Sequence, residues 1–247
     1  MEHISAAITV FLNAAHVGKL KRLKKFAAAL DHVLGDGIPA IVENIKNEDG
    51  RHAIHFAAVG GKVNILKYLI EEMRLDVNVK NGRGETPLSG AAIEGRQAAV
   101  EYLLEMGANP EIPDDSNISP LHHASMKGHK DVIPLLLSKG VDVDVTNDFG
   151  SPLHYAASTG EHDTFKVLLD HGANPNLVFH DVFTPLQASI RSESWQCAEH
   201  LLKAGADPNF GPEGVKPLLL AAPEGITQIV KLLVETGADP NVTNIVS

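Results

Sequence analysis

The chain has 247 residues, of which 31 are acidic and 21 are lysine or arginine, giving a formal net charge of −10 with histidine neutral. Hydrophobic residues make up 44% of the chain and charged residues 21%, which excludes disorder of its bulk and a collagen-like fibre. The negative charge disfavours a general nucleic-acid binder, and the single cysteine, Cys197, excludes an internal disulfide and a four-cysteine zinc site.

The apolar stretch at residues 4–15 is not typical of a secretory signal. Cations follow it at Lys19–Lys25, whereas a secretory signal carries its positive charge first. No apolar run approaches the roughly 20 residues that a transmembrane helix needs. We therefore expect a cytoplasmic protein, with the nucleus as a second compartment, and no membrane partner.

Residues 1–46 predict two helices and one further helical turn. The first helix ends at Ala14–Gly18, the second spans Lys19–Leu34, and the extra turn lies around Ile38–Ile41. Because one face of the second helix is polar, we interpret residues 1–46 as a degenerate N-terminal capping repeat.

Two short sequence patterns recur together between residues 47 and 244. Both the pair Pro-Leu and the motif Gly-Ala-Asp/Asn, or a close variant, return at steps of 32 or 33 residues. A period of this length predicts stacked units that cannot bury their apolar faces alone. The prolines are Pro87, Pro120, Pro152, Pro185 and Pro217, and the glycines are Gly107, Gly140, Gly172, Gly205 and Gly237.

Each copy predicts a short first helix and a longer second helix. Thr86 is a good N-cap, and Pro87 occupies the first helical position, where its missing N–H costs nothing. The first helix stops near Gly95, and apolar residues at helical spacing predict a second helix over Gln97–Met106. Gly107 then supplies the left-handed residue that ends it.

This pattern resembles the ankyrin-repeat family. The resemblance implies an all-α solenoid of helix-turn-helix units with projecting hairpin loops, in six repeats over residues 47–244, with residues 245–247 as the start of a truncated seventh. It is carried by Gly84-Glu85-Thr86-Pro87-Leu88, Ser119-Pro120-Leu121-His122, Gly150-Ser151-Pro152-Leu153-His154-Tyr155-Ala156-Ala157, Gly172-Ala173-Asn174-Pro175-Asn176 and Thr184-Pro185-Leu186. The repeats start near Asn47, Asn81, Asp114, Asn147, His180 and Pro212.

A narrower likeness concerns the order of the repeats, the Leu-Lys-Lys cap helix and the segment Leu75–Asn78. These features are similar to plant ankyrin proteins that carry tetratricopeptide repeats at the C-terminal side. The likeness implies an adaptor whose remaining part, after Ser247, binds another protein.

Metal, cofactor and catalytic chemistry are not expected from the thirteen histidines or from the acidic loops. Structural zinc needs four ligands, and only His52 and His55 could share a helical face. The ankyrin resemblance implies that His55, His122 and His154 bond the backbone of an adjacent loop. Since no nucleophile, phosphate-loop or metalloprotease motif is present, we predict a non-enzyme without cofactor or metal, in which Cys197 is a packing residue.

Two irregular positions bear on the packing of the repeats. Pro134 lies in the second helix of the third repeat and would bend that helix if it fell beyond the first turn. The fifth repeat carries Ser189-Ile190 in place of Ala-Ala and Glu193 in place of glycine, so we expect its packing to be splayed locally.

The expected partner surface consists of residues that vary between repeats beside the hairpins and at the exposed ends of the first helices. In ankyrin proteins these positions line the concave face. Exposed aromatic residues near arginine and histidine have the composition of a binding hot spot. As an alternative, Phe149 and Phe183 pack on neighbouring hairpins within the stack. The predicted partner-binding residues are Arg51, Phe56, Arg83, Ile118, His123, Met126, Phe149, Tyr155, His180, Phe183 and Arg191.

The cations at Lys19–Lys25 form a second candidate surface. They fit a nuclear-localisation or anionic-lipid patch, or else the solvated face of a capping helix, since Leu20 and Leu23 interrupt them. For the whole chain we predict a monomeric, non-catalytic scaffold that binds a partner protein along the concave face and does not bind nucleic acid. The alternative is a regulatory or inhibitory domain of a larger enzyme or channel.

Overall fold

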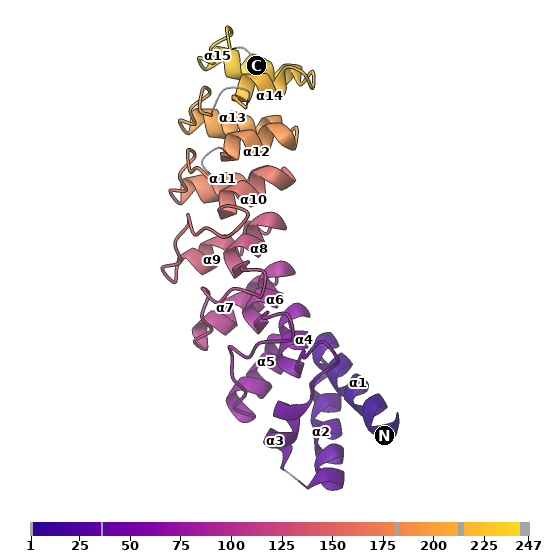
Figure 1. The fold of residues 1–247 in the computed structure, drawn as a ribbon. Coiled ribbons are helices and arrows are strands. Elements are labelled where there is room, and N and C mark those ends of the chain that lie inside the picture. Colours follow the sequence, from indigo (N-terminus) through magenta and orange to yellow (C-terminus); the bar gives the residue numbers. More distant parts are fainter. Residues whose placement is uncertain (1, 36, 181–182, 212–214, 243–247) are drawn as a thin grey trace. The chain divides into compact units, whose positions relative to one another are not determined.

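The computed structural model describes residues 2–35, 37–180, 183–211 and 215–242, and these form helices and turns (Figure 1). Within the described ranges there are isolated β-bridges but no strand, which confirms the all-α prediction. The chain divides into two compact units, one of residues 1–123 with 138–141 and the other of residues 124–137 with 142–247. The expected start of a seventh repeat at residues 245–247 and the repeat start at Pro212 lie outside the described residues.

The N-terminal region has the helices that the sequence predicts. They are α1 (Glu2–Val17), α2 (Leu20–Leu34) and α3 (Ile38–Asn44). Phe11 on α1 and Leu23 on α2 are completely buried, so the apolar faces of both helices belong to the core of the first unit.

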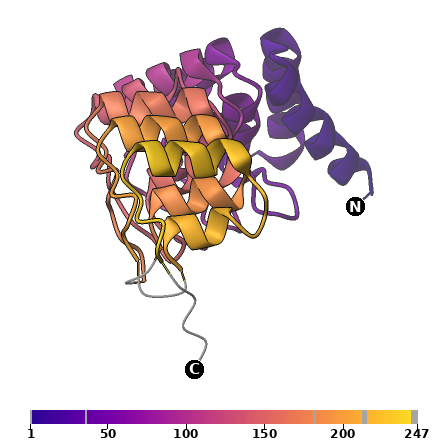
Figure 2. The ribbon, with the colours of Figure 1, turned by 90° about the horizontal axis from the view of Figure 1, so that it is seen from above.

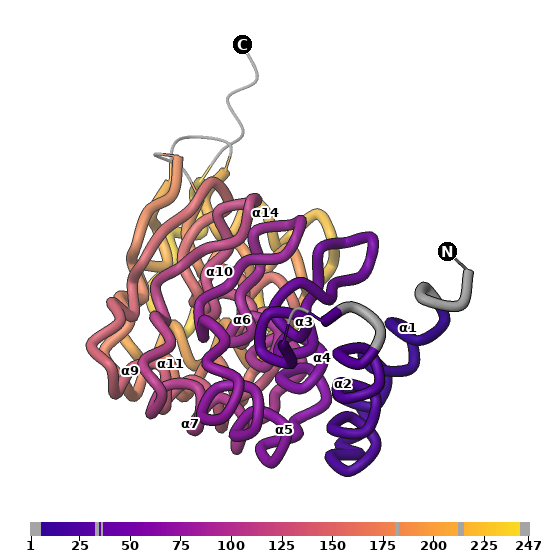
Figure 3. The backbone as a smooth tube through the Cα atoms, turned by 90° about the horizontal axis from the view of Figure 1, so that it is seen from below, coloured from indigo at the N-terminus to yellow at the C-terminus, as the bar shows by residue number. Residues whose placement is uncertain are grey.

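In the first unit, the first helices of successive repeats lie in one row and the second helices in another (Figure 3). In the second repeat, the second helix ends at Glu105, one residue before the predicted end, and the first helix ends at Ile93, two residues before Gly95. The first repeat contains α4 (Ala53–Val59) and α5 (Val63–Lys67), which is continued by a π-helix (Tyr68–Glu72), and the second repeat contains α6 (Pro87–Ile93) and α7 (Gln97–Glu105).

The remaining helices are α8 (Pro120–Met126), α9 (Ile133–Leu137), α10 (Pro152–Thr159), α11 (His162–Asp170), α12 (Pro185–Arg191), α13 (Trp195–Lys203), α14 (Pro217–Ala221) and α15 (Thr227–Glu235). In the second unit, α10, α12 and α14 lie in one layer and α11, α13 and α15 in the other (Figure 2).

Local hydrogen bonds explain where the first helices begin. Thr86 Oγ1 accepts a hydrogen bond from the Ser89 backbone at 3.2 Å, as expected of an N-cap. The start of α12 carries a reciprocal capping box. Thr184 Oγ1 accepts a hydrogen bond from the Gln187 backbone, and Gln187 Oε1 accepts one from the Thr184 backbone at 2.9 Å.

Neighbouring loops are held in register by amide and carboxylate side chains after the second helices. Asn78 Oδ1 accepts a hydrogen bond from the Asn109 backbone at 2.8 Å in the first unit. In the second unit, Asn176 Oδ1 accepts from the Asp207 backbone at 2.8 Å, and its amide donates to the Gly205 carbonyl at 2.9 Å. These bonds satisfy backbone groups that the short hairpins leave unpaired.

Pro134 does not bend a helix. Helix α9 begins at Ile133, so the proline lies in the first turn, where it is tolerated. The consequence is a shorter helix, of five residues compared with nine in α7. In the fifth repeat, Ser189 and Ile190 are buried, and Ser189 Oγ donates to the Leu186 carbonyl at 2.7 Å. The expected local splaying of this repeat stays a prediction.

Cys197 is a packing residue, as predicted. It is completely buried on α13, and Thr164 at the corresponding place on α11 is buried as well. Burial raises the pKa of the Cys197 thiol, so the neutral form that packs in the core is favoured.

Glu193 is the exception in a turn that otherwise uses glycine. Its φ is 55°, and the glycines at the same place in other repeats also have positive φ, at Gly61, Gly95, Gly128, Gly160 and Gly225. A residue with a Cβ atom is strained in this left-handed conformation by about 1–2 kcal/mol.

We predict that Glu193→Gly raises the free energy of unfolding by about 1 kcal/mol, because glycine removes most of that strain. Urea unfolding followed by circular dichroism measures the change. Glu193→Ala is the control, since it removes the carboxylate but keeps the Cβ atom. An equal gain in both variants would assign the effect to charge and contradict the prediction.

Candidate functional site

A cavity of about 400 Å³ lies in the first unit, between α1, α4 and the loop that precedes α4. We call it the N-terminal pocket. It brings together two of the predicted binding residues, Arg51 and Phe56. The pocket is lined by Thr9, Leu12, Asn13 and His16 of α1, Asn47 and Arg51 of the loop, and His55, Phe56 and Val59 of α4.

Arg51 is held in place by its neighbours in the first unit. Its Nη2 donates to Glu85 Oε2 at 3.0 Å, and the side chain is 33% exposed. The same Glu85 oxygen accepts a hydrogen bond from Asn81 Nδ2 at 2.6 Å, and the Arg51 backbone donates to Asn47 Oδ1 at 2.8 Å. The guanidinium therefore has a defined orientation at the pocket.

Three other predicted residues of the first unit lie away from this pocket. Arg83 is exposed on the next hairpin, and Ile118 is half-buried in the loop before α8. The prediction that His123 is an accessible partner-binding residue is wrong. His123 is only 7% exposed, and its Nε2 lies 2.9 Å from Asp114 Oδ2, so the imidazole is committed to a buried pair inside the unit.

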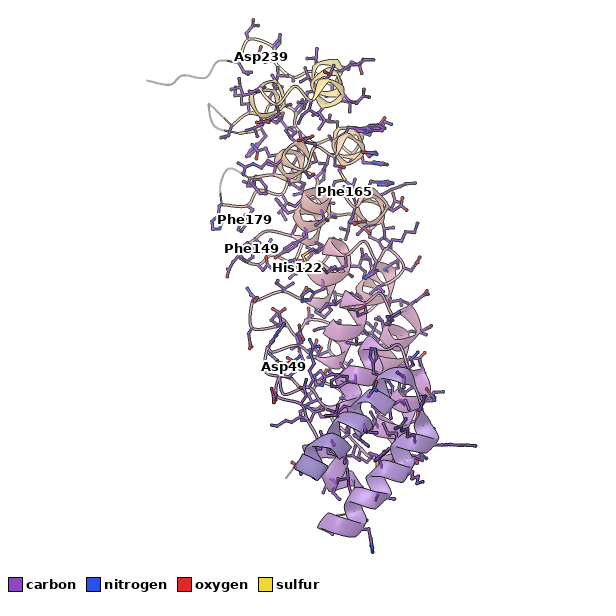
Figure 4. The ribbon with its side chains drawn as sticks, turned by 90° about the vertical axis from the view of Figure 1, so that its right-hand side faces the viewer. Asp49, His122, Phe149, Phe165, Phe179 and Asp239 are labelled. Carbon is purple, nitrogen blue, oxygen red and sulfur yellow. The ribbon has the colours of Figure 1, made fainter. Side chains whose placement is uncertain are left out.

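The second unit gathers five of the predicted residues around α10, α12 and their preceding loops. We call this group, Phe149, Tyr155, His180, Phe183 and Arg191, the aromatic patch. Phe149 is 64% exposed, and Figure 4 shows it on the hairpin side of the stack together with Phe179, whereas the buried Phe165 lies between the helices.

The two alternatives for the phenylalanines apply to different residues. Phe183 packs within the stack, because its ring lies 5.8 Å from that of His154 and its backbone pairs with Phe179. Phe149 instead projects outward, while its backbone donates to Asn147 Oδ1 at 2.9 Å and Asn147 Nδ2 donates to the Tyr155 hydroxyl at 3.1 Å.

Arg191 and His180 complete the aromatic patch. The Arg191 guanidinium carbon lies 5.4 Å from the Phe183 ring centroid, a cation–π arrangement that orients an exposed cation. His180 is exposed, and its ring centroid lies 3.9 Å from that of Phe179 in an edge arrangement. Met126, the remaining predicted residue of this unit, is half-buried at the end of α8.

Two histidines at the starts of first helices, His55 and His154, have the predicted structural role. His55 Nε2 donates to the Glu85 carbonyl at 3.1 Å, and His154 Nε2 donates to the Phe183 carbonyl at 3.3 Å. His122 Nδ1 is 2.7 Å from Ser119 Oγ. Burial lowers the pKa of both His55 and His154 to about 4, so they bridge neighbouring loops as neutral imidazoles.

The basic helix α2 has its apolar side in the core and its cations in solvent. Leu23 is buried, whereas Lys21, Arg22 and Lys25 are exposed. Lys24 Nζ lies 2.8 Å from Glu72 Oε2 and 4.4 Å from the Tyr68 ring centroid. This arrangement supports a solvated capping face, while the localisation and lipid interpretations stay predictions.

No group of three or more histidine, cysteine, aspartate or glutamate side chains suited to a metal ion occurs in the part of the chain that the structure describes. None of its described helices is both long enough and apolar enough to cross a bilayer.

A family model described as ankyrin repeats (3 copies) matches residues 12–114, 107–179 and 177–244. The chain belongs to the ankyrin-repeat family. This match confirms the ankyrin resemblance, and ankyrin repeats are protein–protein interaction modules.

Solved ankyrin structures share this fold. The human ASB11 ankyrin repeat domain has a TM-score of 0.79 and 29% sequence identity, covering 93% of this chain and 98% of that one. The ankyrin repeat domain of Bcl-3, described as a unique member of the IkappaB protein family, has a TM-score of 0.71 and 28% identity, covering 80% and 91%.

Curated relatives are much longer proteins. The chain is 34% identical over 116 residues to ANK repeat-containing protein nipk-1 of Caenorhabditis elegans, covering 42% of this chain and 19% of the relative. It is 29% identical over 212 residues to the Nuclear factor NF-kappa-B p105 subunit of Gallus gallus, covering 81% and 22%. For Ankyrin repeat protein nuc-2 of Neurospora crassa, the identity is 29% over 238 residues, covering 94% and 21%. The chain thus spans about a fifth of the length of these relatives.

Sequence reasoning missed the contribution of α1 to the N-terminal pocket. It treated residues 1–46 only as a cap, although Leu12, Asn13 and His16 line the cavity. The spacing of these three residues on one helical face was the available signal, but the partner helix α4 had to be placed before they could be assigned to a cavity.

We predict that His154→Gln makes the protein less sensitive to acid. The unfolded-state pKa of histidine is about 6.5 and the folded-state pKa of His154 is lowered, so its stabilising contribution is complete above pH 6.5 and is lost as pH falls toward 4. That loss is up to about 3 kcal/mol. Gln187 shows that glutamine makes the same two bonds, accepting from Thr184 at 2.9 Å and donating to Val215 at 2.8 Å.

Urea unfolding at pH 7 and pH 4.5 measures the effect. His162→Gln, at an exposed histidine on α11, is the control and should retain the wild-type pH dependence. A His154→Gln protein that loses as much stability as the wild type between the two pH values would contradict the prediction.

Proposed function

We propose that this chain is a non-catalytic scaffold that recognises a partner protein through the hairpin-side surface of its repeats. The observation that carries the proposal is Phe149, a large aromatic side chain left 64% exposed, whose backbone donates to the Asn147 side chain that also bonds Tyr155. Family membership supports protein recognition in general, and the aromatic patch supports this location.

The chemistry of the aromatic patch suits a protein interface. Burying an exposed phenylalanine removes apolar surface from water, and aromatic and arginine side chains are enriched among residues that dominate binding energy. Arg191 is held over Phe183, which lowers the conformational entropy lost when a partner is bound. The partner is therefore expected to offer an apolar pocket for Phe149 and a hydrogen-bond acceptor for Arg191.

The second candidate function is a regulatory or inhibitory domain that occludes part of a larger enzyme or channel. The observation that favours it is the length of the relatives, of which this chain spans 19–22%. In either case we propose a monomer in the cytoplasm, with the nucleus as a second compartment and no direct nucleic-acid partner. The plant adaptor likeness likewise stays a prediction.

We predict that the double variant Phe149→Ser/Arg191→Gln loses partner binding at least 30-fold, because removal of hot-spot residues costs about 2 kcal/mol or more. Quantitative affinity capture from cell extract, compared with the wild type, identifies partners whose recovery depends on the patch. Binding of those partners is then measured with purified proteins.

Trp195→Ser is the matched control, since Trp195 is an exposed aromatic residue at the start of α13 and outside the patch. Phe183→Ser separately tests stacking and should lower stability. Unchanged recovery of every captured protein by the folded double variant would overturn the proposed binding surface.

A further inference from the structure

The N-terminal pocket has an apolar floor and a polar rim. Leu12 is 4% exposed and lines the cavity together with the half-buried Phe56 and Val59. Its volume of about 400 Å³ falls within the range of about 300–1,000 Å³ that is usual for pockets that bind small ligands. The floor therefore favours an apolar group of the size of an amino-acid side chain or somewhat larger.

The lining of the pocket includes a permanent cation, which pairs with Glu85 beside the pocket, and no carboxylate. The chain has 31 acidic residues, yet none of the nine lining residues is acidic. Arg51 contributes a permanent cation at the rim, and Asn13 and Asn47 contribute neutral amides. A negatively charged group is consequently more compatible with this rim than a positively charged one.

The pairing with Glu85 orients Arg51 and leaves donors for a ligand. A guanidinium has five N–H donors, and Glu85 accepts from Nη2. The Glu85 carboxylate is stabilised independently by Asn81 at 2.6 Å, so it does not depend on Arg51 alone. The remaining N–H groups of a pre-oriented guanidinium suit a carboxylate, which accepts charge-assisted hydrogen bonds.

We propose that the N-terminal pocket binds a partner peptide that places a leucine-sized apolar side chain on Leu12, Phe56 and Val59 and the carboxylate of an adjacent aspartate or glutamate on Arg51. This inference deepens the proposed function and rests on it. It assigns to the first unit a recognition site with its own chemical specificity, separate in composition from the aromatic patch of the second unit.

The test uses the full 247-residue chain and blocked tetrapeptides. Ac-Gly-Leu-Asp-Gly-NH₂ is titrated into ¹⁵N-labelled protein, with the Leu-Asn, Leu-Lys and Gly-Asp peptides as comparisons. We expect saturable shifts of backbone amides in residues 47–59 with a Kd of about 1 mM for Leu-Asp, and at least fivefold weaker binding of each comparison peptide.

Variants separate the carboxylate contact from general charge. Arg51→Gln should weaken Leu-Asp binding about tenfold and leave Leu-Asn binding unchanged. Lys21→Gln removes an equal charge from α2, outside the pocket, and should have no effect. Asn13→Trp covers the rim from an exposed position on α1 and should weaken both peptides, which keeps the test valid if Arg51→Gln disturbs folding.

Four results would overturn the inference. The first three are the absence of amide shifts at the pocket up to about 10 mM Leu-Asp peptide, equal binding of Leu-Asp and Leu-Lys, and equal effects of Arg51→Gln and Lys21→Gln. Pocket amides that shift on dilution of the protein alone would show that a second copy covers the site, which would also overturn it. Because the aromatic-patch variants leave the first unit unchanged, failure of partner capture and failure of peptide binding are observed separately.

Discussion

The close approach of consecutive first helices is the constraint on which this structure depends. Ala57 and Ala91 on α4 and α6, and Ala156 on α10, are completely buried, and a Cβ atom at Gly90 would come within 3.0 Å of Val59 Cγ2. One helical pair cannot bury its own apolar face, so neighbouring repeats must stack. Small residues at these contacts leave room for the first helices to approach closely. Larger side chains such as Leu88 and Phe165 fill the core between the helices, whereas Phe149 lies 64% exposed on the hairpin side.

This stacking also requires the loops to satisfy one another's backbone groups. His55 and His154 do so as neutral imidazoles, and Asn176 and Asn209 accept from the backbone of the following loop at 2.8 Å. A buried histidine in such a position is a structural element, since protonation would place an unfavourable charge in the stack. The many histidines of the chain are therefore poor indicators of metal chemistry.

A regular frame with irregular exposed residues explains how the family binds many partners with one fold. In this chain the irregular positions form two groups of different chemistry. The N-terminal pocket combines an apolar floor with Arg51, and the aromatic patch presents Phe149 outward with Arg191 held over Phe183. Both rest on buried, well-packed helices, so a partner meets side chains whose positions are largely set in advance.

The sequence alone determined the helical repeats, because the Pro-Leu and Gly-Ala-Asp/Asn spacing, the N-cap at Thr86 and the ends of the helices all depend on neighbouring residues along the chain. It could not decide which irregular residues are accessible. His123 and Phe149 were assigned to the same surface, but His123 is buried and paired with Asp114, whereas Phe149 is 64% exposed. The cavity between α1 and α4 was likewise decided only by tertiary structure, since its walls come from segments about 40 residues apart whose packing is not encoded in local spacing.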